Sequence, residues 1–367
     1  MNLADMLSYA DISQLTSIAK RYDCECNKHS KHELIQSILS AISRKDVFEQ
    51  YVKEMTMEEL RFLNSILFDK RSSFSLEELV ARVQLTRFDL EVSKDALPHP
   101  RDTIAKFKHS GWLFNGCCPH TKYLFQIPDD MKTRFRDVLY RRFQLQLIHV
   151  AEPEIYRDED GHIGEDVIKL LRFIQNEPIS LNTEGVMYKR TQQQLLEHMS
   201  ISEAVVQKGE WRFGYGRRFH DYPNRLSLLY DYVFHNGWIE EQNAVLQLTS
   251  SGRDKLLQEY TYEPLLPIYR FWLKLYKNAI PNLPSLISWI NDCAGKWTTL
   301  NSLEEVLHPY IKPFYYDTPE SILRQRIIKM MLHLGFIRIG DLEGEGGVVQ
   351  MTTRGKTIIQ GGLYAEE

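Results

Sequence analysis

The fold is decided by residues 335–355, which read GFIRIGDLEGEGGVVQMTTRG. A glycine followed at once by an aromatic residue is typical of a helix end, because glycine readily adopts the left-handed conformation that stops a helix. Two short apolar runs follow, separated by a glycine-rich turn, and this pattern is typical of a β-hairpin. We therefore expect a helix that ends at Gly335, an aromatic residue that seals it against a sheet, and a two-stranded hairpin.

The same construction occurs twice earlier in the chain. Residues 111–128 read GWLFNGCCPHTKYLFQIP, and residues 237–252 read GWIEEQNAVLQLTSSG. The intervals between the three glycines are unequal, so this is not a tight repeat array. A helix closed by glycine and followed by a hairpin is the back half of a winged helix. We therefore expect a mainly α chain with small β-hairpin wings, an α+β class, made of tandem winged-helix-like domains.

The segments before the hairpins have the helical periodicity that this fold requires. Thr318, Pro319 and Glu320 provide an N-cap, a proline at the first helical position and an acid in the first turn. Pro100 opens the corresponding helix before the first hairpin, and apolar residues recur at helical spacing over 226–233 before the second. Each hairpin is thus preceded by an amphipathic helix.

Residues 1–50 form a helical N-terminal segment. Ser30 is a plausible N-cap, and Glu33 three residues later completes a capping box. Two short helices around a Lys/His/Ser turn resemble a SAP-type helix-loop-helix, a small nucleic-acid-binding motif. A plain helical hairpin that caps the next domain fits the same pattern.

The predicted division of the chain follows its linkers. The acidic, polar stretch 151–164 separates the first two winged-helix units, and prolines bracket a Trp- and Tyr-rich passage over 264–284 that we expect to pack as a helix. The predicted segments are the SAP-like 1–50, winged-helix-like domains over 51–150 and 165–260, and a helical linker with a third such domain over 261–367.

Composition excludes several classes of protein. The 367 residues carry 45 Lys and Arg against 49 Asp and Glu, a net charge of −4, so the chain as a whole is not a polycation. No stretch approaches the ~20 apolar residues that cross a bilayer. The N-terminus lacks the basic and apolar regions of a secretion signal, and five unevenly placed cysteines suit a reducing compartment. We expect a cytoplasmic protein without membrane contact.

No catalytic motif is present. The chain lacks a P-loop, a His-Glu-x-x-His zinc motif and a Gly-x-Ser-x-Gly elbow, so we expect neither enzymatic activity nor a cofactor. Cys24, Cys26, His29 and His32 have donor atoms suited to zinc, but their spacing matches no standard zinc knuckle. We expect no metal there, although a metal- or redox-responsive regulator remains an alternative.

The most informative stretch for function is 185–225. It carries seven Lys and Arg against four acids, interleaved with aromatic residues and glycines. Arginines attract phosphates, and rings between them can stack on exposed bases, so this stretch predicts a nucleic-acid contact. The alternative is that the rings belong to the core and the arginines solvate its rim. The candidate binding residues are Tyr188, Lys189, Arg190, Lys208, Trp211, Arg212, Tyr215, Arg217, Arg218 and Arg225.

Two other charged groups carry less functional weight. Lys132, Arg134, Arg136, Arg141 and Arg142 form a basic group that three aspartates dilute, and we interpret it as the solvated face of a connecting helix. The tip of the third hairpin, 341–347, is acidic and would repel a phosphate backbone. We therefore expect the third domain to contact protein or to use only its helix.

The stretch 166–190 resembles a known family. A short helix, the run PISLNTEG over 178–185 and a Tyr-Lys-Arg helix start are similar to the XPB-type helicase-associated N-terminal region of bacterial proteins. Residues 111–129 and 237–252 fit the same pattern, so the resemblance covers roughly 50–260. It implies an array of winged helices in which Tyr188, Lys189 and Arg190 open a helix near nucleic acid. This chain departs from the family because it has no helicase lobes and no Walker or DExx sequence, so any ATPase belongs to a partner.

These observations favour a non-catalytic DNA-binding protein that supports a helicase or other DNA-processing machinery, with duplex or forked DNA as its partner. The competing hypothesis is a protein-interaction scaffold or regulator that uses winged helices as docking modules without DNA contact. A contiguous basic face would favour the first, and an exposed apolar patch would favour the second.

Overall fold

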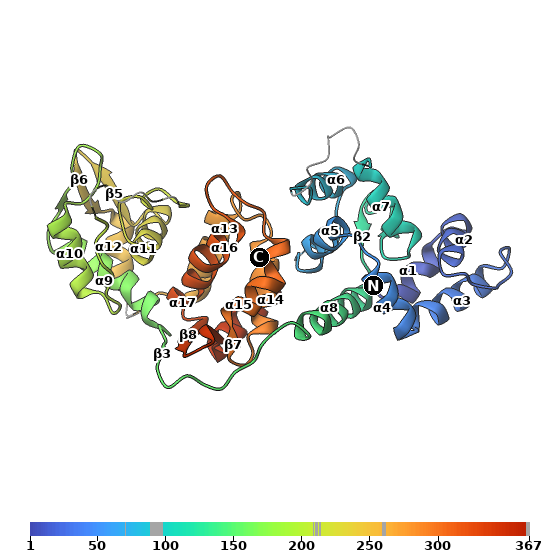
Figure 1. The fold of residues 1–367 in the computed structure, drawn as a ribbon. Helices are drawn as coiled ribbons and strands as arrows, with labels where there is room; N and C mark the ends of the chain where they lie inside the picture. Colours follow the sequence, from blue (N-terminus) through green and yellow to red (C-terminus); the bar gives the residue numbers. More distant parts are fainter. Residues whose placement is uncertain are drawn as a thin grey trace. The chain divides into compact units, whose positions relative to one another are not determined.

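A computed structural model describes residues 1–69, 71–88, 98–207, 209, 212, 214–258 and 262–364, with the side chains of 362–364 left out. The chain divides into two compact units, Met1–Gln146 and Leu147–Glu367 (Figure 1). The first unit holds the predicted segment 1–50 and almost all of 51–150. The second holds 165–260 and 261–367 together.

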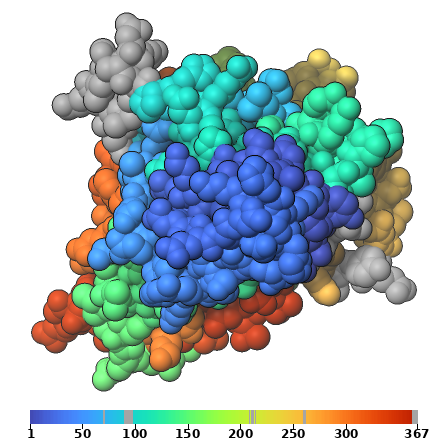
Figure 2. Space-filling view, turned by 90° about the vertical axis from the view of Figure 1, so that its right-hand side faces the viewer, coloured from blue at the N-terminus to red at the C-terminus, as the bar shows by residue number. Residues whose placement is uncertain are grey.

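The first unit is helical with one small hairpin. Its elements are α1 (Leu3–Tyr9), α2 (Ile12–Arg21), α3 (Lys31–Ser43), α4 (Lys45–Lys53), α5 (Met57–Leu67), α6 (Leu76–Leu85), α7 (Pro100–His109), β1 (Phe114–Asn115), β2 (Phe125–Gln126) and α8 (Asp129–Gln144). In Figure 2 the helices of the first fifty residues, in blue, form the near face of this unit.

Trp112, directly after the glycine that closes α7, lies at the centre of the first unit. Its ring meets Phe107 and Phe135 edge to face at 5.4 and 5.3 Å, and its indole N–H donates to the hydroxyl of Tyr22 at 3.0 Å. Such edge-to-face pairs add to the stability gained from burial alone. One buried tryptophan thus joins α2, α7 and α8.

The N-terminal helices begin and end close to where the sequence predicts. Ser30 caps α3, because its hydroxyl accepts from the backbone N–H of Glu33 at 3.3 Å. The predicted reciprocal half of the capping box is wrong: the Glu33 carboxylate accepts instead from the backbone N–H of Asn27 at 3.2 Å. The loop before α3 folds back over the helix start and brings that N–H within reach.

The second unit contains two further helix-and-hairpin groups. Its elements up to the middle are β3 (Tyr156–Arg157), α9 (His162–Asn176), β4 (Ile179–Ser180), α10 (Lys189–His198), α11 (Asn224–His235), β5 (Ile239–Gln242), β6 (Val245–Leu248), α12 (Ser250–Leu257) and α13 (Leu265–Tyr276). The remainder is α14 (Leu283–Cys293), β7 (Thr298–Thr299), α15 (Leu300–Leu307), a 3-10 turn (His308–Tyr310), α16 (Pro319–Ser321), a π-helical stretch (Ile322–Ile328), α17 (Lys329–His333), β8 (Ile337–Leu342), β9 (Gly346–Met351) and α18 (Thr353–Tyr364).

One order of elements occurs three times: a helix, a short strand, two helices and a hairpin. The second unit has it in α9, β4, α10, α11 and β5–β6, where β6 is the middle strand of the sheet, and again from α14 to β9. In the first unit α5, α6, α7 and β1–β2 follow the same order, with an isolated bridge between Phe74 and Phe125 in place of the short strand. All strand pairs are antiparallel.

The three predicted glycine turns are confirmed. Gly111, Gly237 and Gly335 have φ of +68°, +66° and +69°, the left-handed region that stops a helix at low cost only for glycine. Each is followed by an antiparallel hairpin, β1–β2, β5–β6 or β8–β9. The helix predicted over 264–284 is confirmed as α13 and the start of α14.

Part of the predicted linker 151–164 is built into the second unit. Tyr156 and Arg157 pair as β3 with β8, so the segment extends the sheet of the third group. The side chain of Glu159 is 0% exposed and accepts from the ring N–H of His333 at 2.9 Å. An acidic stretch looks like a linker when every acid is assumed to face water. Here Arg225 of α11 and His333 of α17 contact the carboxylate of Glu159 inside the unit.

The chain is mainly helical with a few small antiparallel sheets, in agreement with the predicted mostly α, α+β class. Among the described residues, none of the helices combines the length and the apolar character that a bilayer crossing requires.

Candidate nucleic-acid interface

Arg225, one of the ten predicted contact residues, lies inside the second unit. It is 1% exposed on α11, its guanidinium pairs with Asp166 of α9, and its Nε lies 3.5 Å from Glu159. Its backbone N–H donates to Glu203 at 3.0 Å. A side chain in this position cannot reach a phosphate in solution.

Arg217 and Arg218 share one carboxylate on β5. Glu241 accepts from Arg217 at 2.7 Å and from Arg218 at 2.9 Å. Burial alone would raise the pKa of Glu241, but hydrogen bonds from Tyr230 and Arg218 outweigh it and hold that pKa below its usual value. Arg217 also lies over the ring of Phe234 on α11 at 4.1 Å, and the buried Arg218 donates to the carbonyl of Glu184 at 3.0 Å, so both arginines are engaged by neighbouring parts of the second unit.

Arg212 and Tyr215 also make internal contacts. Arg212 donates to the carbonyl of Tyr222 at 3.2 Å and lies over the ring of Phe219. Tyr215 is buried, donates to Asp317 at 2.9 Å and meets Tyr276 edge to face, and burial raises the pKa of its hydroxyl. The rings of Tyr215 and Phe219 therefore belong to the core, which is the alternative to a nucleic-acid contact. Lys208 and Trp211 lie outside the described residues.

The remaining three predicted residues are accessible, and Arg217 is also exposed despite its ion pair with Glu241. Tyr188 is the N-cap of α10, as the sequence predicts, and is 55% exposed. Lys189 and Arg190 follow on the first turn, both exposed, and neither side chain forms an ion pair with any residue that the structure describes. Because Tyr215, Arg218 and Arg225 are buried, the ten residues do not form one surface.

A basic surface that sequence reasoning missed lies on the first unit. Residues 100, 103, 104 and 107 of α7 are buried, and helical spacing therefore turns Arg101, Lys108 and His109 outward on the opposite side. Lys106 lies at the edge of this side and pairs with Glu59 at 2.5 Å. Residues 101–110 contain a single acid, Asp102, so this side of the helix is positive.

The hairpin that follows α7 extends this surface. The ammonium group of Lys108 donates to Asn115 of β1 at 3.0 Å, and the amide of Asn115 donates to the carbonyl of Lys122 at 3.0 Å. Tyr123 is 74% exposed, with the Lys122 ammonium group 4.7 Å from its ring centre. We call Arg101, Lys108, His109, Lys122 and Tyr123 the α7–hairpin face. The turn between the strands also exposes Cys117 and Cys118.

A signal for this face was present in the sequence. The basic residues of α7 avoid the positions of its apolar stripe, and Lys122 falls in the predicted turn, directly before the strand run that begins at Tyr123. The stretch has fewer arginines than 185–225, so counting charge favoured 185–225 over this face. The arginines of 185–225 differ from the cations of the α7–hairpin face because carboxylates pair with several of them. Those carboxylates, such as Asp166 and Glu241, lie far from the arginines in the sequence.

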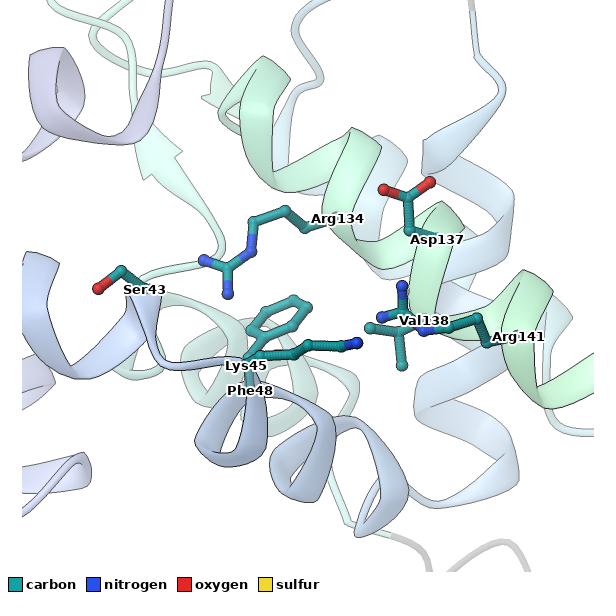
Figure 3. Close-up of a pocket in the computed structure, with 7 residues that line it drawn as sticks. All are labelled: Ser43, Lys45, Phe48, Arg134, Asp137, Val138 and Arg141. Carbon is teal, nitrogen blue, oxygen red and sulfur yellow. The ribbon is translucent and has the colours of Figure 1, made fainter.

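A hollow of about 470 Å³ opens on the first unit between the α3–α4 junction and α8 (Figure 3). Its lining residues are Ser43, Lys45, Phe48, Arg134, Asp137, Val138 and Arg141. The guanidinium of Arg134 lies over the ring of Phe48 at 4.4 Å, and burial lowers the pKa of Arg134. The basic group of α8 is thus only partly the solvated face that the sequence predicts.

Within the described part of the chain, no three His, Cys, Asp or Glu side chains are grouped as metal ligands would be, Cys24, Cys26, His29 and His32 included. No family model, curated protein or solved structure matches this chain. The resemblance to the XPB-type helicase-associated region therefore stays a prediction.

Proposed function

We propose that the protein binds nucleic acid without catalysis, as an array of three winged helices that supports a helicase or other DNA-processing machinery. The α7–hairpin face carries this proposal. In a winged helix, the third helix and the hairpin after it are the elements placed to meet a duplex. In the first unit, both elements expose positive charge on one continuous surface.

The chemistry of this face suits a nucleic-acid backbone. Arg101, Lys108 and Lys122 provide cations for phosphates, and the exposed ring of Tyr123 can stack on a base or a sugar. The acids Glu58 and Glu59 beside α7 are paired with Arg87 and Lys106, so the exposed cations of this face favour a polyanion. Tyr188, Lys189 and Arg190 on α10 offer a second, smaller contact in the second unit.

The second unit is less suited to a duplex. Ten residues of α11 are buried, and so are most of those from Ile322 to His333, so the third helices of both groups pack inside the unit. Residues 147–367 carry 23 Lys and Arg against 29 Asp and Glu, whereas 1–146 carry 22 against 20. We propose that the second unit contacts a protein partner, which preserves the scaffold hypothesis as the alternative for the whole chain.

The test is fluorescence anisotropy with labelled duplex, single-stranded and forked DNA at several salt concentrations. Two double variants remove equal charge: Lys108→Gln with Lys122→Gln on the α7–hairpin face, and Lys189→Gln with Arg190→Gln on α10. We expect the first to lower affinity about tenfold or more, and to reduce the slope of log affinity against log salt by about two. We expect the second to change affinity less.

The other outcomes decide between the alternatives. A loss confined to the α10 variant would move the interface to the second unit. Weak, salt-insensitive association of the wild-type protein with all three DNAs would exclude nucleic-acid binding and favour the scaffold.

A further inference from the structure

The hollow between α4 and α8 has a feature that the α7–hairpin face does not explain, a partly buried guanidinium that no carboxylate of the described residues pairs with directly. Arg134 forms no hydrogen bond or ion pair with any described residue. One face of its guanidinium is covered by Phe48, which is buried and held in turn by Phe135 at 4.9 Å. The charge of Asp130 offsets part of the effect of burial on Arg134, but its carboxylate forms no ion pair with the guanidinium and accepts from the backbone N–H of Leu3 at 2.8 Å.

Burial makes this cation costly unless an anion joins it. The lowered pKa of Arg134 reflects a charge that water solvates poorly. The ring of Phe48 offsets part of that cost through its π face, but it satisfies none of the guanidinium's N–H donors. In Figure 3 these donors point into the hollow, toward the end of α3.

Two more cations line the other side of the hollow and share a single carboxylate. Glu49 lies 2.8 Å from Arg141 and 3.9 Å from Lys45. Asp137 stands on the rim, and in Figure 3 its carboxylate points away from Arg134 and Lys45. Arg141 is 48% exposed, and an ion pair this exposed is weak, so an incoming anion can share or replace Glu49.

We propose that this hollow binds a phosphate group, held by Arg134, Lys45 and Arg141. A guanidinium presents a planar pair of N–H donors that matches two phosphate oxygens. A partly buried guanidinium gains more from such a bidentate anion than from water. Phe48 has its ring face occupied by Arg134, so the hollow recognises the phosphate and not an attached base. The phosphate belongs either to a nucleic-acid backbone or to a free phosphorylated compound.

The test uses the full chain and two probes, inorganic pyrophosphate by isothermal titration and labelled duplex DNA by anisotropy across salt concentrations. The variants are Arg134→Gln and Arg141→Gln. The matched control is Arg136→Gln, because Arg136 also lies on α8 over a buried ring, that of Phe68 at 5.0 Å, but outside the hollow. Thermal melts verify that all three variants fold. Because Arg141 is exposed, we expect Arg141→Gln to fold as the wild type does.

We expect Arg134→Gln to weaken the binding of at least one probe about tenfold, Arg141→Gln to weaken the same probe, and Arg136→Gln to change it less than twofold. Loss of DNA affinity with a salt slope reduced by about 0.9 identifies a backbone phosphate. Loss confined to pyrophosphate identifies a free phosphorylated compound.

The proposal is overturned if the wild-type protein binds neither probe at millimolar concentration, or if Arg134→Gln and Arg136→Gln have equal effects. It does not depend on the α7–hairpin face. Unchanged DNA binding in the Lys108 and Lys122 double variant, with DNA or pyrophosphate binding lost in Arg134→Gln, would reject that face as the interface and retain the phosphate site.

Discussion

The basic side chains of this protein differ in what lies within hydrogen-bond reach of them. Arg225 meets Asp166 and Glu159, both 0% exposed, and the same Glu159 accepts from His333. Burial alone would raise the pKa of Glu159, but the hydrogen bond from His333 and the charges of Arg157 and Arg225 outweigh it, so its pKa is lowered. Lys122 and Arg190, in contrast, extend into water. The first kind of cation holds α9, α11 and α17 together, and only the second kind is available to a ligand.

Arg225→Ala is expected to lower the free energy of unfolding by about 3–5 kcal/mol, because it leaves the buried carboxylate of Asp166 without its closest cation and removes one of the positive charges around Glu159. Urea unfolding at neutral pH, followed by circular dichroism, measures this loss. The matched control is Arg190→Ala, an exposed change expected to stay within about 0.5 kcal/mol of wild type. Equal effects of the two substitutions would contradict the assignment of Arg225 to the core.

Asp231 on α11 gives a pH prediction. Burial raises the pKa of its carboxyl to about 6, although the backbone N–H of Arg217 donates to it at 2.9 Å. The raised pKa means that the folded protein favours the neutral carboxyl. Its contribution to stability is therefore complete below the unfolded-state pKa near 4 and is lost as pH rises through about 6.

Asp231→Asn removes this loss while retaining an oxygen that accepts from Arg217. We expect the variant to exceed wild type in unfolding free energy at pH 7.5, by up to about 3 kcal/mol, with the difference disappearing toward pH 4. Urea unfolding at a series of pH values gives the difference directly. A difference that does not change with pH would show that folding leaves the pKa of this carboxyl unchanged.

At the scale of elements, the helix-to-hairpin turns explain why the three groups share one construction. Each turn needs a residue with positive φ directly before the aromatic that packs on the sheet. The surroundings differ, however. A Cβ on Gly237 would meet nothing within 4 Å, whereas one on Gly335 would lie 2.8 Å from the Cα of Asp160. The third turn therefore carries a packing requirement in addition to the conformational one.

Gly237→Ala is expected to cost about 1–2 kcal/mol, the strain of a left-handed alanine. Gly335→Ala is expected to cost more, about 3 kcal/mol, because the backbone of Asp160 must also shift. Chemical unfolding of the two variants compares them at the same substitution. If Gly237→Ala proved the costlier change, the close packing of Asp160 on the third turn would be wrong.

At the scale of the whole molecule, charge is divided unequally. Residues 1–146 carry 22 Lys and Arg against 20 acids, and 147–367 carry 23 against 29, which is a net charge of +2 against −6. The boundary of the two compact units falls at Gln146, so each charge balance belongs to a separate body. A polyanion is attracted to the first and repelled by the second.

We expect the fragment 1–146 to retain DNA affinity at least equal to that of the full chain at low salt, because it keeps the α7–hairpin face and loses the acidic unit. The fragment 147–367 serves as the control and is expected to bind at least tenfold more weakly. Anisotropy with both fragments, after circular dichroism has verified that each is helical, measures the difference. Stronger binding by 147–367 would place the interface on α10.

Local rules were sufficient for much of the fold. The three glycine turns, the hairpins and the caps at Ser30 and Thr318 follow from the sequence, because each depends on residues within a few positions of one another. The helix that opens after Tyr188 begins where the family resemblance implies a start. The amphipathic helices follow from the sequence as well, since their apolar faces repeat at the helical period. These features fixed the mainly helical class and the number of hairpins.

The fate of the charged residues required the tertiary structure. Arg225 and Asp166 are 59 positions apart, and His333 and Glu159 are 174 apart, so no local pattern pairs them. The local sequence around an arginine does not show whether its side chain faces water or a buried carboxylate. Only folding places the carboxylate beside the arginine. The sequence therefore determined where helices stop and hairpins begin, whereas the tertiary structure decided which cations remain exposed, because ion pairing depends on distance in space.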